Sequence, residues 1–467
     1  MLELTEGLDS ASGRPLYQQL YDSLTAQIRD GRLTVGERMP GKRSLASQLA
    51  VSVNTVDTAY QMLVAEGYLE SRPRSGFFVQ DVPKTFAAPD PAQQPAAKAA
   101  ESARWRFDCS TGSVDTTLFP FRSWGRIQRE LLFDHPELLH HGHRQGDENL
   151  RQAVAEYLRA YRGVACSPEQ IVVGAGVEYL LGLAAQLLSG SVAAVEEPGY
   201  DRSRTILENN GIPCRTVALD ASGLSVEALQ RSGANLCYVT PSHHFPTAVT
   251  MPVGRRAQLL QWAGQPGRYI LEDDYDAEFR FDMRPLPSLQ GMAGPDGPVL
   301  YLCTFSKSLA PSIRIACMVL PTGLMARYRA VFGAYSNTVS RFEQQTLCRF
   351  LTEGHFTRHL ARMRGVYHRR MQLLCAALES AFGRDRLLLQ GRHTGLHLML
   401  TLRDGPGERR MVESARAAGV RMAGLSEYYR DGAAQRPGRG GCGGAGRGLG
   451  GKPRPPGRDH RGLCGGE

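Results

Sequence analysis

Between Trp105 and Arg430, short apolar runs of strand length alternate with segments of helical periodicity. The runs are IVVGAG (171–176), VAAVEEPGY (192–200), NLCYVTPS (235–242), RYILEDDYD (268–276), VLYLCTFS (299–306) and IACMVLP (315–321). Near-continuous apolar runs between helices are typical of parallel strands that are buried on both faces. The pattern predicts an α/β domain at 105–430, with reactive groups at the carboxyl ends of its strands. A later run, HTGLHLMLTL (393–402), predicts the start of a smaller C-terminal subdomain.

Length and composition indicate a globular protein of more than one domain. The chain has 467 residues, of which 42% are hydrophobic and 22% charged. Its first ten residues, MLELTEGLDS, are acidic and lack the apolar core of a signal peptide, and no apolar run reaches the roughly 18 residues that span a bilayer. We therefore expect a cytoplasmic protein with no membrane partner. Ten cysteines without a CxxC pair are expected to be buried, reduced thiols.

Residues 1–80 read as a separate domain. A helix is predicted after Pro15, a turn and short helix at 37–50, and a longer helix at 52–67 that Ser52 caps. Two short strands around a Pro/Gly turn follow at 68–79. Three helices followed by a hairpin predict a winged helix-turn-helix, which is a DNA-binding fold.

The DNA interpretation depends on this motif and not on bulk charge. The chain has a net charge of +9, but residues 1–80 carry eight Lys/Arg against nine Asp/Glu. Near the start of the predicted recognition helix, Asn54 and Thr55 are expected to face base edges. The remaining candidate contacts flank that helix or form the wing, and they are Arg43, Ser52, Arg72, Arg74, Ser75 and Gly76. The expected partner is a double-stranded DNA operator.

The segment 81–104 separates the two predicted domains. It contains eight alanines and four prolines, and Phe86 is its only aromatic residue. This composition predicts a linker.

A lysine ends one of the predicted strands. The run at 299–306 stops at Ser306-Lys307, and Arg314 follows seven residues later. A lysine at the carboxyl end of a strand can form a Schiff base with pyridoxal 5'-phosphate. That cofactor also requires a carboxylate on its pyridine nitrogen, a donor near its ring oxygen, and an arginine, hydroxyls and a helix N-terminus for its phosphate.

The sequence offers a group for each requirement. In chain order these are a glycine turn before a helix (Gly176, Val177), an aromatic ring after EEPG (Tyr200), a strand-end carboxylate and phenol (Asp273, Tyr275), hydroxyls beside the lysine (Thr304, Ser306) and a phosphate arginine (Arg314). Asp274 is the alternative to Asp273 for the pyridine nitrogen. Each group alone is a weak signal, but the ordered set is specific.

Two sets of motifs resemble known families. PLYQQLYDSL, MPGKRSLASQLAVSVNTV and AEGYLESRPRSGFFV resemble a GntR-type winged helix. LFPFRSW, LRQAVAEYL, EEPGY, TPSHHFPT, LEDDYDAEFRF and TFSKSLAPSIR resemble the fold-type I aminotransferase-like domain of MocR-type regulators. The resemblance implies that Lys307 carries pyridoxal phosphate as an aldimine, and it makes Arg202 a candidate effector contact. It also implies a head-to-tail homodimer that responds to a small amine, an amino acid or the cofactor itself.

Three functions remain open at the level of sequence. The leading hypothesis is a transcriptional regulator that depends on pyridoxal phosphate. The alternative is an active aminotransferase with an appended DNA-binding head, and a third is an aminotransferase fold that has become a dimerisation scaffold. The histidines of HHGH (140–143) invite a metal interpretation, but no further ligand is suitably spaced, so we expect no metal site.

The sequence changes character after GVRMAGLSEYY (419–429). Of residues 431–467, 14 are glycine, and the segment carries seven Lys/Arg against three Asp/Glu. A basic nucleic-acid tail and simple disorder are two interpretations. We favour a third, a frameshift near 429–435, because the resemblance to the family also breaks there. The family's final strand, with its arginine for the effector's carboxylate, would then be missing. The protein as written is therefore expected to hold pyridoxal phosphate poorly if at all and not to respond to a carboxylated amine.

Overall fold

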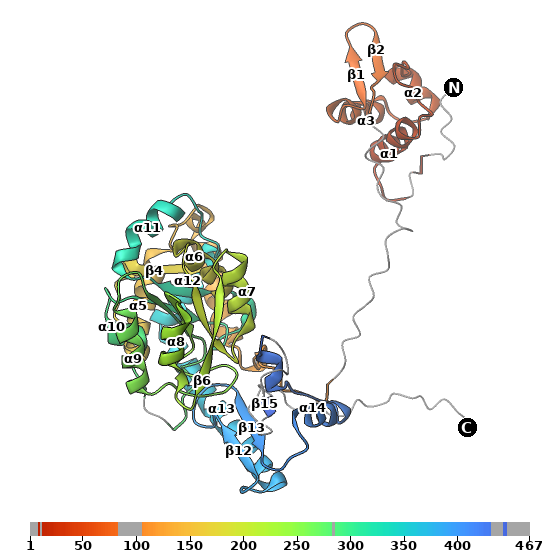
Figure 1. The fold of residues 1–467 in the computed structure, drawn as a ribbon. Coiled ribbons are helices and arrows are strands. Elements are labelled where there is room, and N and C mark those ends of the chain that lie inside the picture. The colour runs from red at the N-terminus through yellow and green to blue at the C-terminus, as the bar shows by residue number, and fades with distance from the viewer. Residues whose placement is uncertain (1–7, 10–11, 83–104, 283–284, 431–441, 446–467) are drawn as a thin grey trace, which may run out of the picture. The chain divides into compact units, whose positions relative to one another are not determined.

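The computed structural model describes residues 8–9, 12–82, 105–282, 285–430 and 442–445 (Figure 1). The chain divides into two compact units, Met1–Ser102 and Ala103–Glu467. The predicted linker at 83–104 and most of the predicted tail lie outside the described residues. Within the described ranges, no helix is long and apolar enough to cross a membrane.

The N-terminal unit is the predicted winged helix-turn-helix. Its elements are α1 (Leu16–Arg29), α2 (Lys42–Gln48), α3 (Val53–Ala65), β1 (Leu69–Arg72) and β2 (Gly76–Val79). The apolar faces of the helices meet in one core, in which Leu24, Val56 and Tyr60 are fully buried. The antiparallel pair β1–β2 forms the wing, and the Met39 N–H donates to the Phe77 carbonyl beside it. The unit therefore has a hydrophobic core of its own, built only from its own residues.

An eight-stranded sheet forms the centre of the second unit. Its order is β4-β11-β10-β9-β8-β5-β6-β7. The strands are β4 (Ile171–Gly174), β5 (Ala193–Glu197), β6 (Cys214–Asp220), β7 (Gly223–Leu224), β8 (Leu236–Val239), β9 (Tyr269–Asp274), β10 (Val299–Thr304) and β11 (Ala316–Val319). Strands β4, β8, β10 and β11 are buried along their whole length, as their continuous apolar runs predict.

Strand β11 corrects one sequence-based expectation. The run at 315–321 was expected to be parallel to its neighbours, but β11 is antiparallel to both β10 and β4. The connection from β10 to β11 spans only residues 305–315. A parallel return needs a crossover of about a dozen residues or more, so this short connection can only reverse the chain. The reversal keeps Lys307 and Arg314 on the same short connection.

Helices cover both faces of this sheet. They are α4 (Phe121–Asp134), α5 (Glu148–Arg162), α6 (Val177–Leu187), α7 (Asp201–Asn209), α8 (Val226–Ser232), α9 (Val253–Ala263), α10 (Leu289–Ala293), α11 (Thr322–Phe332), α12 (Arg341–Thr352) and α13 (His355–Phe382). Alternate strand residues point to opposite faces. Thus Leu300 and Leu302 of β10 join a cluster with α6 and α11, whereas Tyr301 and Cys303 join one with α5, α12 and α13.

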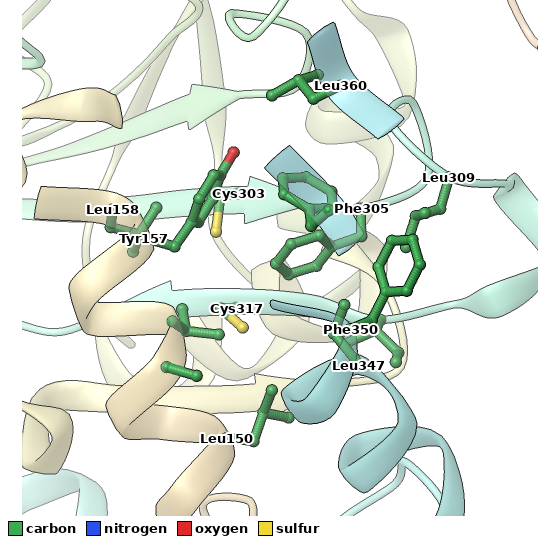
Figure 2. Close-up of a cluster of buried hydrophobic side chains, with 14 of the residues drawn as sticks. Leu150, Tyr157, Leu158, Cys303, Phe305, Leu309, Cys317, Leu347, Phe350 and Leu360 are labelled. Carbon is green, nitrogen blue, oxygen red and sulfur yellow. The ribbon is translucent and has the colours of Figure 1, made fainter. Parts of the chain in front are cut away.

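Figure 2 shows part of the second cluster, where side chains of α5 and α12 meet the strand ends. Phe305, directly after β10, lies with its ring centroid 5.9 Å from that of Tyr157 and 5.8 Å from that of Phe356. Packed aromatic rings fix the backbone just before Lys307, because a close-packed core leaves little room for movement. The backbone that carries Lys307 is therefore held in place by this packing.

A smaller sheet follows α13. It contains β12 (Leu387–Gln390), β13 (Leu398–Leu402) and β15 (Cys442–Ala445), in the order β12-β13-β15. The helix α14 (Glu408–Ala417) and the pair β14 (Val420–Arg421) and β3 (Phe107–Asp108) lie in the same unit. Strand β15 lies in the segment 431–467, for which disorder was one of the interpretations, and it pairs antiparallel with β13. Glycines give no apolar periodicity, so the sequence carried no signal for this strand.

Candidate functional site

The predicted site residues converge at the carboxyl ends of β9 and β10. These strands are parallel neighbours, with Asp273 opposite Leu302 and Asp274 opposite Cys303. The EDDYD segment and the loop that carries Lys307 therefore leave the sheet side by side, which is where α/β proteins place their binding sites.

Asp273 is a buried carboxylate, and only one of its two oxygens accepts a hydrogen bond among the described residues. The Tyr238 hydroxyl donates to its Oδ2 at 2.5 Å, and among the described residues its Oδ1 has no hydrogen-bond partner. Burial raises the pKa of Asp273 to about 7, although the Tyr238 hydrogen bond and the nearby charge of Lys307 lower it. A buried carboxylate in this state is suited to a cationic or N–H partner.

Asp274 has a different environment. Its Oδ2 accepts hydrogen bonds from Arg162 Nε at 2.6 Å and from the Tyr301 hydroxyl at 2.6 Å, and Arg162 Nη2 is also bound to it. The two charged side chains form a buried ion pair, with 3% and 1% of their surfaces exposed. The charge of Asp274 is thus balanced by Arg162, although its Oδ1, like that of Asp273, has no hydrogen-bond partner among the described residues. Neither Arg162 nor Tyr301 was singled out by its sequence pattern.

Lys307 is the only lysine between residues 99 and 451. It is half-buried, and its Nζ donates to the Thr111 carbonyl at 3.1 Å. Beside it, the Thr304 hydroxyl donates to Ser306 Oγ at 2.9 Å and accepts from the Ser306 N–H at 3.1 Å. The two predicted hydroxyls thus lie together at the end of β10, directly before Lys307.

The predicted phosphate cradle lies at the N-terminus of α6. Gly176 precedes this helix with a φ of 95°, a conformation that favours glycine, and Val177 is the first helical residue. A Cβ atom at Gly176 would lie 2.6 Å from Arg314 Nη2, so a larger residue here would force the guanidinium group to shift from its present position. Arg314 Nη2 donates to the Ala175 carbonyl at 3.1 Å. A helix N-terminus and an arginine together favour an anion.

Glu178 also lies in this cradle, and the sequence interpretation missed it. Its Oε2 accepts from Arg314 Nη2 at 2.6 Å, and its Oε1 accepts from Arg202 Nη1 at 3.3 Å. The hydrogen bond from Arg314 is the main reason that the pKa of Glu178 is lowered. An acid in the first turn of a helix is ordinary, so its position in the sequence does not single it out.

Tyr200 contributes to an aromatic wall. It is the N-cap residue of α7, and its ring centroid lies 6.1 Å from that of Phe245, with the rings nearly perpendicular. Phe245 is 4.9 Å from the Tyr428 ring and 5.3 Å from the His397 ring. Phe245 and Tyr428 come from segments far apart in sequence, so their proximity could not be read from spacing.

A hydrogen-bonded cluster connects the small sheet to the site. Asp276 Oδ2 accepts from the Leu396 N–H at 2.9 Å and lies 3.0 Å from His243 Nδ1, and the His243 and His397 rings are 4.0 Å apart. The His243 carbonyl in turn accepts from the Tyr275 hydroxyl at 2.7 Å. Tyr275, the predicted ring-oxygen partner, is therefore linked to the strand β13, which begins directly after His397.

The predicted DNA-contacting residues gather on α2, on the first turn of α3 and on the wing. Ser52 caps α3, since its Oγ accepts the Thr55 N–H at 3.0 Å and lies 2.8 Å from Thr55 Oγ1. Asn54 and Arg43 are exposed. Thr55 is half-buried, and its hydroxyl already contacts Ser52, so its side chain is less available than that of Asn54.

The wing residues are unequal. Arg72 binds Glu70 Oε2 through Nε at 2.9 Å and Nη2 at 2.8 Å, and it lies over the Phe78 ring. Arg74 is exposed at the tip with a φ of 61°, and the Ser75 N–H closes the turn onto the Arg72 carbonyl at 3.0 Å. Gly76 begins β2. The arginine at the tip is thus better placed to reach a phosphate than the one at its base.

The fold and these two sites define a class of protein, a DNA-binding head joined to an aminotransferase-like domain. Residues 16–79 match the family described as bacterial regulatory proteins, gntR family. Residues 111–417 match the family described as aminotransferase class I and II.

Whole-chain relatives define the class further. The chain is 39% identical to the uncharacterized HTH-type transcriptional regulator YhdI of Bacillus subtilis, over 92% of either chain. It is 33% identical to the probable rhizopine catabolism regulatory protein MocR of Rhizobium meliloti, over 90% of this chain and 89% of that one. It is 31% identical to the HTH-type pyridoxine biosynthesis transcriptional regulator PdxR of Corynebacterium glutamicum, over 88% of either chain. The chain belongs to the MocR-type GntR family and is a DNA-binding transcriptional regulator.

Solved structures show the fold of the second unit. Pyrococcus horikoshii kynurenine aminotransferase aligns with a TM-score of 0.65 at 23% identity, covering 77% of this chain and 92% of that one. LysN of Thermus thermophilus, an α-aminoadipate aminotransferase complexed with N-(5'-phosphopyridoxyl)-L-leucine, aligns with a TM-score of 0.62 at 24% identity, covering 74% and 89%. The second unit thus has the fold-type I aminotransferase fold.

Proposed function

We propose that this regulator binds pyridoxal phosphate at Lys307 and uses the bound cofactor to sense a small amine, an amino acid or the cofactor itself. One observation carries the proposal. The only lysine of the α/β domain lies beside a buried carboxylate with an uncommitted oxygen and in the same unit as a glycine–arginine anion cradle. The aldehyde of pyridoxal phosphate condenses reversibly with amines, so an amine effector can exchange with the lysine.

The donor set fits the cofactor. Asp273 would hold the pyridine nitrogen, because Asp274 is already paired with Arg162. Tyr275 would have to turn its single hydroxyl proton from the His243 carbonyl to the ring oxygen, and Tyr200 would cover a ring face. The phosphate would be held by Arg314 and the Gly176–Val177 helix start, with Thr304 and Ser306 nearby. Arg202 remains the candidate contact for an effector's carboxylate.

The test is optical. Lysine-bound pyridoxal phosphate absorbs visible light, so protein kept at a saturating concentration of the cofactor should be yellow. A colourless protein would contradict the proposal. Repeated turnover of an amino donor and a keto acid would instead support an aminotransferase with a DNA-binding head.

The proposed assembly is a head-to-tail homodimer that acts on DNA in the cytoplasm. Support for a second copy comes from four apolar side chains on α4 and the following turn. They are Phe121, Leu132, Phe133 and Leu139, with 65%, 60%, 76% and 77% of their surfaces exposed. Large apolar side chains exposed within one short segment of chain are common at protein interfaces.

In the DNA-binding head, we propose that Arg43 and the wing residues Arg72, Arg74, Ser75 and Gly76 mainly contact phosphates, whereas Asn54 and Thr55 face base edges and Ser52 holds the helix start. Arg43→Ala should weaken binding to all duplexes about equally and should lower the slope of log affinity against log salt by about one. The measurement is a salt titration with an unrelated duplex. Arg43→Lys should keep the slope, and an unchanged slope in Arg43→Ala would contradict the phosphate role.

A further inference from the structure

The proposed anion cradle already contains an anion from the chain itself. Glu178 binds Arg314 at 2.6 Å with one carboxylate oxygen and Arg202 at 3.3 Å with the other. It thus connects the arginine proposed for the cofactor's phosphate with the arginine proposed for the effector's carboxylate. The Glu178 side chain is 35% exposed, so solvent and ligands can reach it.

Charge decides what can replace Glu178. The two guanidinium groups and the carboxylate carry a net charge of +1, and the N-terminus of α6 adds a partial positive charge. A ligand carboxylate brings the same single charge as Glu178, so it gains little by displacing it. A phosphate monoester carries a charge between about −1.5 and −2 at pH 7 and offers three acceptor oxygens, so it competes better for Arg314.

We propose that Glu178 determines which ligands this subsite accepts. In the absence of a phosphate ester, the Glu178 carboxylate is bound to Arg314 and blocks that position. Ligands with a phosphate monoester displace it from Arg314, and ligands with only a carboxylate do not. After displacement Glu178 keeps its contact with Arg202. The inference rests on the proposed binding of pyridoxal phosphate, and it makes Glu178 a competitor of the phosphate and not a ligand of the cofactor.

The experiment compares pyridoxal phosphate with pyridoxal, which lacks the phosphate. Each is titrated into the full-length wild type and into Glu178→Gln, and visible absorbance reports binding. Removal of the competing charge should tighten pyridoxal phosphate binding by about tenfold, the range of one charge-assisted hydrogen bond. Pyridoxal binding should not change. Inorganic phosphate should also compete with pyridoxal phosphate more effectively in Glu178→Gln than in the wild type.

Two variants separate charge from structure. Glu178→Asp keeps the charge and should keep the wild-type ratio of the two affinities. Glu227→Gln removes a carboxylate on α8 that pairs with Arg231 and should also keep that ratio. If Glu178→Gln binds pyridoxal phosphate more weakly than the wild type, or shifts both ligands equally, the inference is wrong. If neither ligand gives a visible band in any variant, the proposed cofactor site is wrong instead.

Discussion

Lys307→Ala should abolish the aldimine absorbance band that the wild type shows when it is saturated with pyridoxal phosphate. No other lysine lies between residues 99 and 451, so no other lysine of that part of the chain can replace the lost bond. The side chain is half-buried and its Nζ donates to the Thr111 carbonyl, away from the packed aromatic core, so the variant should still fold. Absorbance and circular dichroism of the same sample separate cofactor loss from misfolding.

Lys42→Ala is the matched control for this variant. Lys42 begins α2 in the N-terminal unit, where it pairs with Asp57. Its replacement should leave the absorbance of the bound cofactor unchanged. A normal band in Lys307→Ala would show that another group holds the cofactor.

Asp273→Asn should weaken pyridoxal phosphate binding by about 10- to 100-fold, because it removes a charge-assisted hydrogen bond worth about 1.5–3 kcal/mol to a pyridinium nitrogen. The same change should stabilise the cofactor-free protein at alkaline pH. The measurements are an absorbance titration and thermal melting between pH 4 and pH 8. Asp385→Asn, at an exposed position before β12, should change neither.

The sign of the stability change follows from the pKa. Burial raises the pKa of Asp273 to about 7 from an ordinary value of 3.8. Between those values the folded chain holds a proton that the unfolded chain has released, so the free energy of unfolding falls as the pH rises from about 4 to about 7. Three pH units correspond to at most about 4 kcal/mol. Asparagine does not titrate, so Asp273→Asn should not lose stability over this pH range. Its melting temperature should exceed that of the wild type at pH 8 and should be close to it at pH 4. Equal melting at both pH values would contradict the account.

The parts of the fold that were predictable are those in which local pattern and burial agree. The run at 299–306 is apolar at every position before its polar end because β10 is buried on both faces, and its length marks it as a strand. In α3, apolar residues at helical spacing (Val56, Ala59, Tyr60 and Leu63) and the Ser52 cap predicted a helix of the DNA-binding head in the same way. Strand β6 was missed because it is largely exposed and its polar residues hide the pattern.

The site was predictable as a set of chemical groups but not as a set of contacts. The choice between Asp273 and Asp274 depends on Arg162, which lies 112 residues away from Asp274. Glu178 and His397 belong to the site surroundings only because the fold brings them to Arg314 and His243. Long-range pairings of this kind leave no trace in residue spacing, so only the structure could identify them.

The state of the cofactor site should change the affinity of the protein for DNA. The direct measurement is the affinity of the full chain for a duplex selected in vitro from a random pool, with and without pyridoxal phosphate and a panel of amino acids. Two sites that bias one equilibrium must alter each other's affinity, and typical coupling is about 5- to 150-fold. We predict a shift of this kind for at least one ligand combination in the wild type and none in Lys307→Ala. Equal DNA affinity of the wild type in the presence and absence of bound cofactor, with every amine tested, would contradict the account.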